Sequence, residues 1–458
     1  MFRFYIALIL SKLAYAVIRL LGRNASQFPG RLAINICPDF LGKIAKPKKI
    51  ICVTGTNGKT TTNNLIIDSL TGLGYKVLDN NYGSNIDAGI ASSLVKGTKI
   101  SNKAKFEIAV FEVDERSSIK IYPYIKPTYV LCTNLFRDSI KRNAHPEFIS
   151  SIINKGLPED TILILNADDP ISSRLGTKSN TRIFFGIDKQ PFDLDTPLNI
   201  INDQRICPKC GTKLEYNYVR YHHIGNCYCP NCDFKSPTAD ISIKTIDFKN
   251  QKIIVKVDNK EEEFKLFSSQ IFNIYNEIAV ITALYTLGIS TKDIQSQINN
   301  LHIVESRYNE VEKNGIKIIG NLCKGQNPVA LSCIFDFLNR DKANKQIILL
   351  LDDKYDAKDS SENSTWMYDA DFEFLNAKHI TKIVIGGKRS EDFYLRLLLA
   401  GVPKEKLVYD FDVNQVGQHV DIADANEIYI LYDIYNGDLQ RNARDVILQK
   451  IEGGNAND

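Results

Sequence analysis

A loop of glycine and threonine near the start of the chain carries the residue types that hold a nucleoside triphosphate. Residues 54–62 read TGTNGKTTT, after a β-branched run at 48–53 and before a helical pattern from Lys59 to Leu73. Glycines let backbone N–H groups converge on phosphate oxygens, and the start of a helix adds positive charge. A lysine here neutralises the β- and γ-phosphates, while the next threonine hydroxyl binds Mg²⁺. The predicted ATP-binding residues are Gly55, Thr56, Asn57, Gly58, Lys59, Thr60 and Thr61.

The loop departs from the common phosphate-binding consensus, because Val53 stands where the first glycine belongs. A turn with a chance Gly-Lys-Thr is the alternative, but the order of strand, loop and helix favours nucleotide binding. A carboxylate at the end of a neighbouring strand would complete the site, since Mg²⁺ prefers oxygen ligands. Glu112, near the end of the run FEIAVFEV, is the predicted Mg²⁺ ligand alongside Thr60. Asp114 and Glu115 are weaker candidates, expected to be solvated charges.

Five of the ten cysteines lie between positions 207 and 232. Four of them form two C-P-x-C pairs separated by 18 residues, the spacing of a zinc ribbon, in which four thiolates surround one structural Zn²⁺. Disulfides or free thiols are the alternative. The predicted Zn²⁺ ligands are Cys207, Cys210, Cys229 and Cys232. Cys227, His222 and His223 are left over, and we expect them at the surface, with Cys227 as a fallback ligand.

Strands and helices alternate over most of the chain, which predicts the α/β class with a largely parallel, doubly wound sheet. Beyond the cysteines, residues 241–257 read as a hairpin, and two helices follow at about 269–287 and 291–301. The alternation restarts near Gly315 and ends in a helix over 438–449. We predict a helical leader at 1–47, a central ATP-binding domain at 48–304 with the ribbon inserted at about 205–235, and a C-terminal Rossmann-like domain at 305–458.

The composition excludes several classes of protein. With 458 residues, of which 44% are hydrophobic and 24% charged, the chain is typical of a globular protein of about three domains. The 57 basic and 54 acidic residues nearly balance, which argues against a dedicated nucleic-acid-binding protein. The first uncharged run, residues 4–11, is too short to span a bilayer. We expect a cytoplasmic protein whose N-terminal amphipathic helix packs on its own domain or, alternatively, lies on the inner face of the membrane.

The phosphate loop resembles that of the Mur ligase superfamily, the ATP-dependent amide ligases of peptidoglycan assembly. Other stretches agree with the family: Phe111-Glu112-Val113, Thr133-Asn134-Leu135 with Asp138, and the turn Asn166-Ala167-Asp168-Asp169-Pro170. Asn273 and Asn276 resemble its G-x-x-N-x-x-N helix start, with Gln270 in place of the first glycine, which adds Asn273 to the ATP-binding residues. Because only about 50 residues precede the loop, we do not expect the additional domain of ligases that act on UDP-linked muropeptides.

The short leader and the ribbon resemble the MurT branch, the ligase subunits of lipid II isoglutaminyl synthase; the folylpolyglutamate branch usually has GKGS in its loop. Ser306-Arg307 resembles a Gly-Arg element, which implies that Arg307 faces the nucleotide. Residues 366–373 resemble a Trp-x-x-Asp-x-Asp-Phe-Glu run of this branch. Its members also carry an acid that completes the catalytic triad of a glutaminase partner, GatD. Asp353 is the first candidate for that acid and Asp356 the second, with a charged surface loop as the alternative.

The resemblance implies a carbon–nitrogen ligase that activates the α-carboxylate of D-glutamate in the lipid II stem peptide as an acyl phosphate. Ammonia, released from glutamine by a GatD-type class I glutaminase in a heterodimer, would then give D-isoglutamine. The implied cofactors are ATP, Mg²⁺ and structural Zn²⁺, the substrate lies at the inner membrane face, and no nucleic acid is involved. The alternatives are a single-chain Mur or folylpolyglutamate-type amino-acid ligase, a zinc-ribbon nucleic-acid-binding NTPase, and a non-catalytic scaffold.

Overall fold

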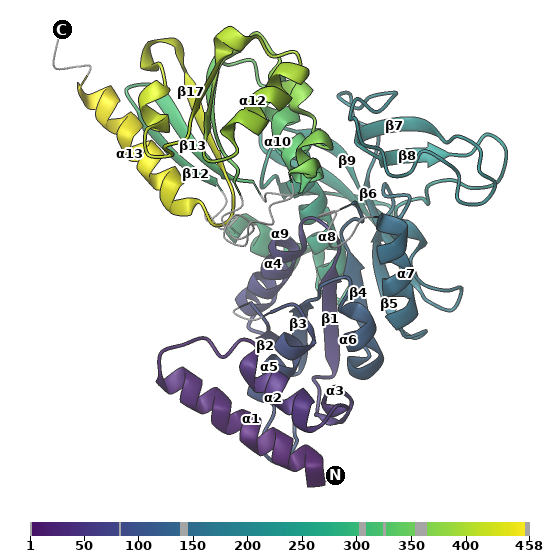
Figure 1. Ribbon diagram of the computed structural model, residues 1–458. Coiled ribbons are helices and arrows are strands. Elements are labelled where there is room, and N and C mark those ends of the chain that lie inside the picture. Colours follow the sequence, from purple (N-terminus) through teal and green to yellow (C-terminus); the bar gives the residue numbers. More distant parts are fainter. Residues whose placement is uncertain are drawn as a thin grey trace. The chain divides into compact units, whose positions relative to one another are not determined.

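The structure, a computed structural model, divides into two compact units, which we describe separately (Figure 1). It describes residues 2–81, 84–137, 145–301, 308–323, 327–352 and 364–453. The first unit takes residues up to 303, apart from two short segments. The second unit contains the described residues after 303, together with Leu198–Asn202.

A nine-stranded sheet forms the centre of the first unit among the residues described, in the order β11-β10-β9-β6-β5-β4-β1-β3-β2. The strands from β2 to β9 pair in parallel, and β9, β10 and β11 pair antiparallel. Their bounds are β1 Lys49–Thr54, β2 Val77–Asp79, β3 Ile108–Glu112, β4 Tyr129–Cys132, β5 Ile162–Asn166, β6 Arg182–Ile187, β9 Ile241–Asp247, β10 Lys252–Val257 and β11 Lys260–Lys265. Because β1 lies between β3 and β4, the carboxyl ends of these three strands meet at one edge, where ligands bind in open α/β sheets.

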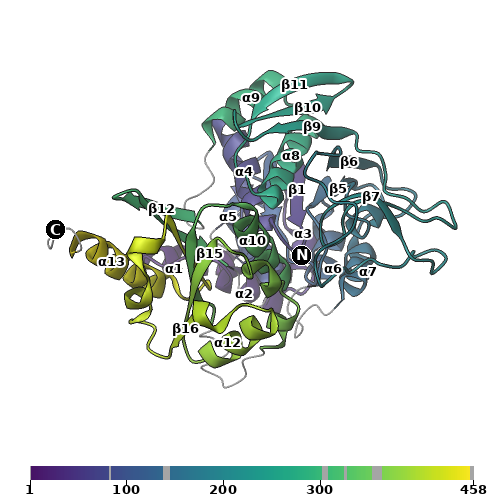
Figure 2. The same cartoon turned by 90° about the horizontal axis from the view of Figure 1, so that it is seen from above.

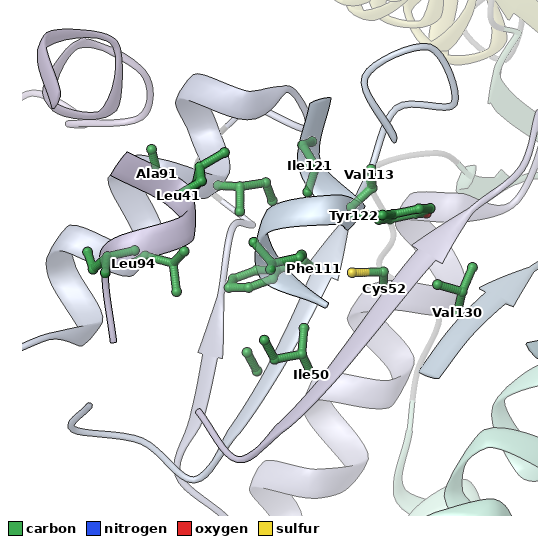
Figure 3. Close-up of a cluster of buried hydrophobic side chains, with 14 of the residues drawn as sticks. Leu41, Ile50, Cys52, Ala91, Leu94, Phe111, Val113, Ile121, Tyr122 and Val130 are labelled. Carbon is green, nitrogen blue, oxygen red and sulfur yellow. The ribbon is translucent and has the colours of Figure 1, made fainter. Parts of the chain in front are cut away.

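Helices cover the parallel part of this sheet, and the strands are accordingly apolar on both faces. One core cluster brings Ile50 and Cys52 of β1 and Phe111 of β3 against Leu94 and Tyr122 of the neighbouring helices (Figure 3). The helices are α4 Lys59–Gly72, α5 Asp87–Gly97, α6 Ser118–Ile125, α7 Pro146–Gly156, α8 Ile271–Thr286 and α9 Thr291–Asn300, with a 3-10 turn at Ser172–Arg174. The core thus fixes β1 and β3, the two strands that lead into the predicted site.

Three helices precede β1: α1 Phe2–Leu20, α2 Phe28–Ile36 and α3 Phe40–Lys43. The inward side of α1 buries Phe4, Ala7, Leu8 and Ser11, a spacing of three and four residues that follows one helix face. The ring of Phe4 lies 5.4 Å from that of Phe40. Among the described residues, no helix has the length and apolar character needed to cross a bilayer.

The cysteine-rich segment is inserted between β6 and β9 and contains a two-stranded hairpin, β7 Glu215–Tyr221 and β8 Ile224–Tyr228. Both views show this hairpin beside β6 (Figures 1 and 2). His222 in its turn adopts a left-handed φ of 49°. Cys227 of β8 packs with Leu214, Phe234, Cys207 and Cys229 in a small, separate apolar core.

The second unit is built on a six-stranded sheet in the order β12-β13-β17-β14-β15-β16, with all described pairs parallel except β12 with β13. Separate apolar clusters lie on its two faces. The strands are β12 Tyr308–Lys313, β13 Ile316–Leu322, β14 Lys345–Leu350, β15 Ile380–Gly386, β16 Leu407–Asp410 and β17 Glu427–Tyr432. The helices are α10 Pro328–Arg340, α12 Ser390–Leu399 and α13 Gly437–Gly453, with 3-10 turns at Thr365–Tyr368, Phe372–Leu375, Lys404–Lys406, Val416–His419 and Ile422–Asp424.

The acidic run at residues 366–373 has a structural role in the second unit. Asp371 accepts hydrogen bonds from the Asn199 side chain at 2.8 Å and the Ile200 backbone at 2.6 Å. Arg396 donates to Glu373 and to the Ala370 carbonyl, both at 2.9 Å. Asp371 therefore holds the segment Leu198–Asn202 in this unit, although that segment precedes the ribbon in sequence.

The α/β class with parallel sheets is confirmed, and the expected hairpin at 241–257 is β9 with β10. Six of the described strands were not expected from the sequence: β6, β7, β8 and the edge strands β11, β12 and β16. The run KEEEFK of β11 is strongly charged and has one solvent-facing edge, so it lacks the apolar alternation that marks a strand in sequence.

Candidate active site

The phosphate loop connects the carboxyl end of β1 to the start of α4. Gly55 has a φ of +123° and Gly58 a φ of +85°, a left-handed conformation that glycine adopts without strain. A Cβ atom would lie 2.3 Å from the Thr133 hydroxyl at position 55 and 2.1 Å from Asn276 Oδ1 at position 58. Both backbone conformation and packing therefore require glycine at these two positions.

Residues 133–136, which follow β4, hold the phosphate loop in one conformation. The Thr133 hydroxyl donates to the Asn57 carbonyl at 2.6 Å. Asn134 accepts from the Asn57 N–H at 3.0 Å and donates to its carbonyl at 3.1 Å. The Phe136 N–H donates to the Thr56 hydroxyl at 2.9 Å. The loop is therefore preorganised, which reduces the entropy lost when a ligand binds.

Glu112 and Thr60 line the same polar cavity, of about 160 Å³. The parallel register pairs Val53 of β1 with Glu112 of β3, which brings the carboxylate beside the loop. Asn80 accepts from the Glu112 N–H and donates to its carbonyl, both at 2.9 Å, while Asn85 donates to Oε1 at 3.1 Å. A carboxylate and a hydroxyl that face one cavity are a donor set that suits Mg²⁺. The supporting asparagines were not predicted, although the run DNNYGSN at residues 79–85 is a visible signal for them.

Lys59 forms a buried ion pair with Glu115, at 2.7 Å. The ammonium also donates to the carbonyls of Gly55 and Thr56, so it lies within the loop. Burial raises the pKa of Glu115, and the charge of Lys59 opposes that shift. The expectation that Glu115 is solvated is therefore wrong. Asp114 is half-buried and accepts from the N–H groups of Arg116 and Ser117, which lie just before α6.

The start of α8 packs directly on the phosphate loop. Asn276 approaches Gly58 and accepts from the Thr62 hydroxyl at 3.4 Å. Its amide donates to Asn273 Oδ1 at 3.4 Å, and Asn273 donates to the side chains of Gln270 and Ser268. Gln270 caps α8 with an extended backbone, so a glycine is not needed at that position. The predicted ATP ligand Asn273 thus lies next to the residue that contacts the loop.

The four predicted zinc ligands come together in the first unit. The sulfur atoms of Cys207, Cys210, Cys229 and Cys232 all lie within 4.8 Å of one another. A tetrahedral Zn²⁺ with bonds of about 2.3 Å places its sulfurs about 3.8 Å apart, so this arrangement fits the ion. The Lys209 N–H donates to the sulfur of Cys207 and the Asn231 N–H to that of Cys229, both at 3.4 Å, and these hydrogen bonds would stabilise thiolates.

Three residues near the ribbon were expected at the surface, and that expectation is wrong. Cys227, His222 and His223 are fully buried. The Ser236 hydroxyl donates to the Cys227 sulfur at 3.6 Å, and burial raises the pKa of this thiol to about 11. Cys227 therefore serves the apolar core beneath the hairpin. The two histidines pack against the ring of Phe136.

A buried arginine joins the hairpin to the sheet. Arg220 of β7 donates to Asp168 at 2.8 Å, to the Tyr275 hydroxyl at 2.6 Å and to Asp193 at 3.1 Å. It also donates to two backbone carbonyls at the end of β6, at 2.6 and 2.7 Å. Burial alone would lower the pKa of Arg220, but Tyr275, Asp168 and Asp193 raise it overall, so the guanidinium remains charged. Sequence reasoning missed this residue because its partners are distant in the chain.

The hairpin turn also reaches the phosphate loop through Phe136. The ring of Phe136 lies 4.4 Å from that of His223, and its backbone binds Thr56. His223 lies 3.3 Å from Asp169, which accepts from the Leu135 N–H at 2.8 Å. Burial would raise the pKa of Asp169, but its contacts with His223 lower it overall. The ribbon, the turn after β5 and the phosphate loop therefore form one contact network.

Three predicted site residues, Arg307, Asp353 and Asp356, lie outside the described residues.

Comparison with known proteins agrees with the fold and the site. The family model described as Mur ligase middle domain matches residues 53–284, and the one described as MurT ligase C-terminal matches residues 324–435. A pseudomurein peptide ligase type C from Methanothermus fervidus has a similar structure, with a TM-score of 0.68, 21% identity and coverage of 90% of this chain and 80% of that one. The MurF ligase of Thermotoga maritima, solved in complex with ADP, has a TM-score of 0.60 and 16% identity over 93% of this chain and 84% of that one. Fold and phosphate loop thus define a protein of the Mur ligase class.

Sequence relatives narrow this class. The subunit MurT of lipid II isoglutaminyl synthase (glutamine-hydrolyzing) from Staphylococcus aureus strain COL is 32% identical over 406 residues, which cover 87% of this chain and 89% of that protein. Its counterpart from Streptococcus pneumoniae is 30% identical over 93% of each chain. The chain belongs to the MurT family of ligase subunits.

Proposed function

We propose that this chain is the ATP-dependent subunit of a lipid II isoglutaminyl synthase. In this assignment residues 48–304 form the ATP-binding domain with its ribbon, residues 1–47 the leader and residues 305–458 the C-terminal domain. The observation that carries the proposal is the shared cavity of Thr60 and Glu112 beside Lys59, in a chain of the MurT family. We expect the terminal phosphate of a nucleotide held by the loop to end in this cavity.

The proposed reaction has two steps. A carboxylate oxygen of the D-glutamate residue attacks the γ-phosphorus of ATP, and the bond from that phosphorus to the β-phosphate oxygen breaks. ADP departs, and the product is an acyl phosphate. Ammonia then attacks the acyl carbon, the bond to the phosphate oxygen breaks, and inorganic phosphate leaves as the nitrogen loses a proton. Both steps need neutralised charge and aligned reactants more than they need an acid or a base.

The residues of the loop divide this work. Backbone N–H groups of Gly55, Thr56, Asn57 and Gly58, together with Thr61, would bind the phosphates, and Asn273 and Arg307 would contact the nucleotide. Lys59 would neutralise the β- and γ-phosphates. Thr60 and Glu112 would hold Mg²⁺, which draws charge from the phosphate oxygens.

The relatives are named as subunits, which supports a partner in a complex. We propose that this partner supplies the ammonia. We assign this role to a GatD-type class I glutaminase. In that complex Asp353, or failing that Asp356, would orient the partner's catalytic histidine. Lipid II as the substrate would place the complex at the inner face of the membrane.

The test is amidation of lipid II by the purified chain with its glutaminase, ATP and glutamine. Lys59→Ala should abolish product formation, because the phosphates lose their cation, while circular dichroism shows that the fold persists. The melting temperature should fall by several degrees, because the buried Glu115 also loses its ion-pair partner. Lys155→Ala, which removes an exposed lysine of α7, is the matched control. Full turnover by the Lys59→Ala variant would refute the proposed role of the loop.

Three other outcomes would redirect the assignment. Incorporation of an amino acid without a glutaminase would indicate a single-chain ligase. Stimulation of ATP hydrolysis by DNA or RNA, and not by lipid II, would indicate a nucleic-acid-binding NTPase. Absence of any ATP turnover with all substrates present would indicate a scaffold.

A further inference from the structure

Helix α1 is apolar on two opposite faces. One face packs on its own unit through Phe4, Ala7, Leu8 and Ser11. The opposite face, which we call the outer face, consists of Phe2, Ile6, Ile9, Leu13, Val17 and Leu20, whose exposed fractions run from 36% to 86%. These residues recur every three or four positions, so they form one continuous stripe along the whole helix. Helix α1 lies along the outside of the first unit (Figure 1).

A stripe of this length is more than the scattered apolar residues of an ordinary surface. Helices that are apolar all round belong in a protein core or in contact with lipid. Leu10 and Leu21, exposed by 42% and 69%, widen the stripe on one side. The outer face therefore needs an apolar partner that the described part of this unit does not supply.

The charge around this helix indicates the kind of partner. Residues 1–38 contain five basic residues and no aspartate or glutamate, although the whole chain is nearly neutral. Arg19, Arg23 and Arg31 are exposed, whereas Lys12 is tied to the carbonyls of Val95 and Thr98. An apolar stripe flanked by cations alone matches the two components of an anionic bilayer surface, acyl chains below and phosphate groups above.

The same helix also borders a cavity that leads toward the phosphate loop. This cavity of about 350 Å³ is lined by Tyr15 and Arg19 of α1, by Lys96 of α5 and by Asn80 at the end of β2, among others. Asn80 also lines the smaller cavity that contains Thr60 and Glu112. This cavity, which carries the cations Arg19 and Lys96 and one carboxylate, Asp79, therefore extends from the side of α1 to the residue that holds the Glu112 backbone.

We propose that the outer face of α1 lies in the interfacial layer of an anionic phospholipid bilayer, with the helix axis parallel to the membrane plane. Docked in this way, α1 presents the cavity at Arg19 and Lys96 to the headgroup of a membrane-anchored substrate. This part of the inference rests on the proposed function, while the docking itself does not.

The test measures flotation of the full-length chain with vesicles of phosphatidylglycerol and phosphatidylcholine, and with vesicles of phosphatidylcholine alone. The wild type should float with the anionic vesicles and much less with the neutral ones. Leu13→Glu combined with Val17→Glu should weaken binding at least about tenfold, because each buried aliphatic side chain contributes about that factor. The matched control is Ile100→Glu combined with Phe148→Glu, which changes two residues of the same unit with exposed fractions of 63% and 55% and adds the same charge.

Three results would overturn the docking proposal: no flotation of the wild type, equal loss in both double variants, or a different occupant of the outer face. A second copy would appear as a dimer in sedimentation that the Leu13→Glu, Val17→Glu variant dissociates. A protein partner would appear as loss of the glutaminase complex in that variant. Both substitutions lie on the exposed face of α1 and leave its buried face unchanged. A melting temperature near that of the wild type therefore confirms that the variant is folded.

A second readout separates this proposal from the proposed function. Amidation of lipid II in vesicles should fall in the α1 variant, while amidation of detergent-solubilised lipid II should stay near wild type. If no amidation occurs in either setting but flotation follows the prediction, the proposed function fails and the docking surface stands. If both substrates are amidated equally by the variant, delivery through α1 is refuted.

Discussion

Replacing Arg220 by methionine is expected to loosen the ribbon hairpin from the sheet. Its side chain is fully buried, and its two terminal nitrogens contact the buried carboxylates of Asp168 at 2.8 Å and Asp193 at 3.1 Å. Methionine fills similar space without a charge, so the substitution leaves both acids without a cation, although Asp168 still accepts from the Tyr275 hydroxyl and Asp193 from the Gln190 N–H. Breaking a buried pair in this way costs about 3–5 kcal/mol, because an uncompensated charge remains in the interior.

This cost can be converted to a melting temperature. A unit of about 300 residues unfolds with an entropy of about 0.6 kcal/mol/K, so about 3–5 kcal/mol lowers its melting temperature by about 5–8 °C. An exposed arginine gives the baseline. Arg23→Met should change the melting temperature by less than about 1 °C, since surface substitutions stay within about 0.5 kcal/mol.

The assay is differential scanning calorimetry of the metal-loaded chain, with a double-mutant cycle on Asp168→Asn. Because Asp168 and Arg220 are in direct contact, the double variant should lose less than the sum of the two single variants, by about 1–3 kcal/mol. The ATP dissociation constant is the second readout, because the same network fixes the loop through Phe136 and Thr56. We expect it to rise in Arg220→Met.

Two results would refute this reasoning. A melting temperature for Arg220→Met within the range of Arg23→Met would mean that the buried acids are neutral or reach water. Strict additivity with Asp168→Asn would mean that the 2.8 Å contact contributes no coupling energy.

Three further predictions follow from single contacts. Gly58→Ala should weaken ATP binding at least about tenfold in calorimetric titration, because its Cβ meets Asn276 and its φ is left-handed; adding Asn276→Ala should recover part of the loss, and wild-type affinity in the single variant would contradict the packing. Burial raises the pKa of Glu277, in α8, from 4.5 to about 8, so folding favours its neutral form. The stability that this group contributes is complete below pH 4.5 and is lost as the pH rises to about 8. The melting temperature of Glu277→Gln should therefore fall less than that of the wild type between about pH 5 and pH 8, and parallel curves would count against it. Cys210→Ser should abolish stoichiometric zinc in elemental analysis of the purified protein while Cys227→Ser retains it; the reverse result would make Cys227 a ligand.

The elements that lead into the site were the most predictable part of the chain. The run at 48–53 is apolar on both faces, and the phosphate loop then needs glycines at two left-handed or crowded positions, so local sequence specifies both. The four ribbon cysteines are predictable for a similar reason, because two short pairs close one metal site with little help from the rest of the fold. In these cases residues close in sequence define the chemistry.

The parts that sequence reasoning missed depend on contacts between distant segments. Glu115 reads as a surface acid because nothing nearby shows that Lys59 neutralises it. The two histidines of the hairpin turn read as surface residues, and Arg220 carries no sequence signal, for the same reason. Their partners lie after β4, after β5, in β6 and in α8. Polar residues are buried only where a specific partner meets them, and pairing across 50 residues or more leaves no periodic signal.

The pair of Lys59 and Glu115 makes triphosphate binding a competition for one ammonium group. When phosphate oxygens take that charge, the buried carboxyl loses the cation that had opposed the rise of its pKa. We therefore expect its pKa to rise further, so that Glu115 takes up a proton as the nucleotide binds. ATP affinity should therefore fall with increasing pH through that titration, and the heat of binding should depend on the ionisation enthalpy of the buffer. In Glu115→Gln both dependences should disappear. In the wild type, the proton taken up on binding would be released each time the spent nucleotide leaves.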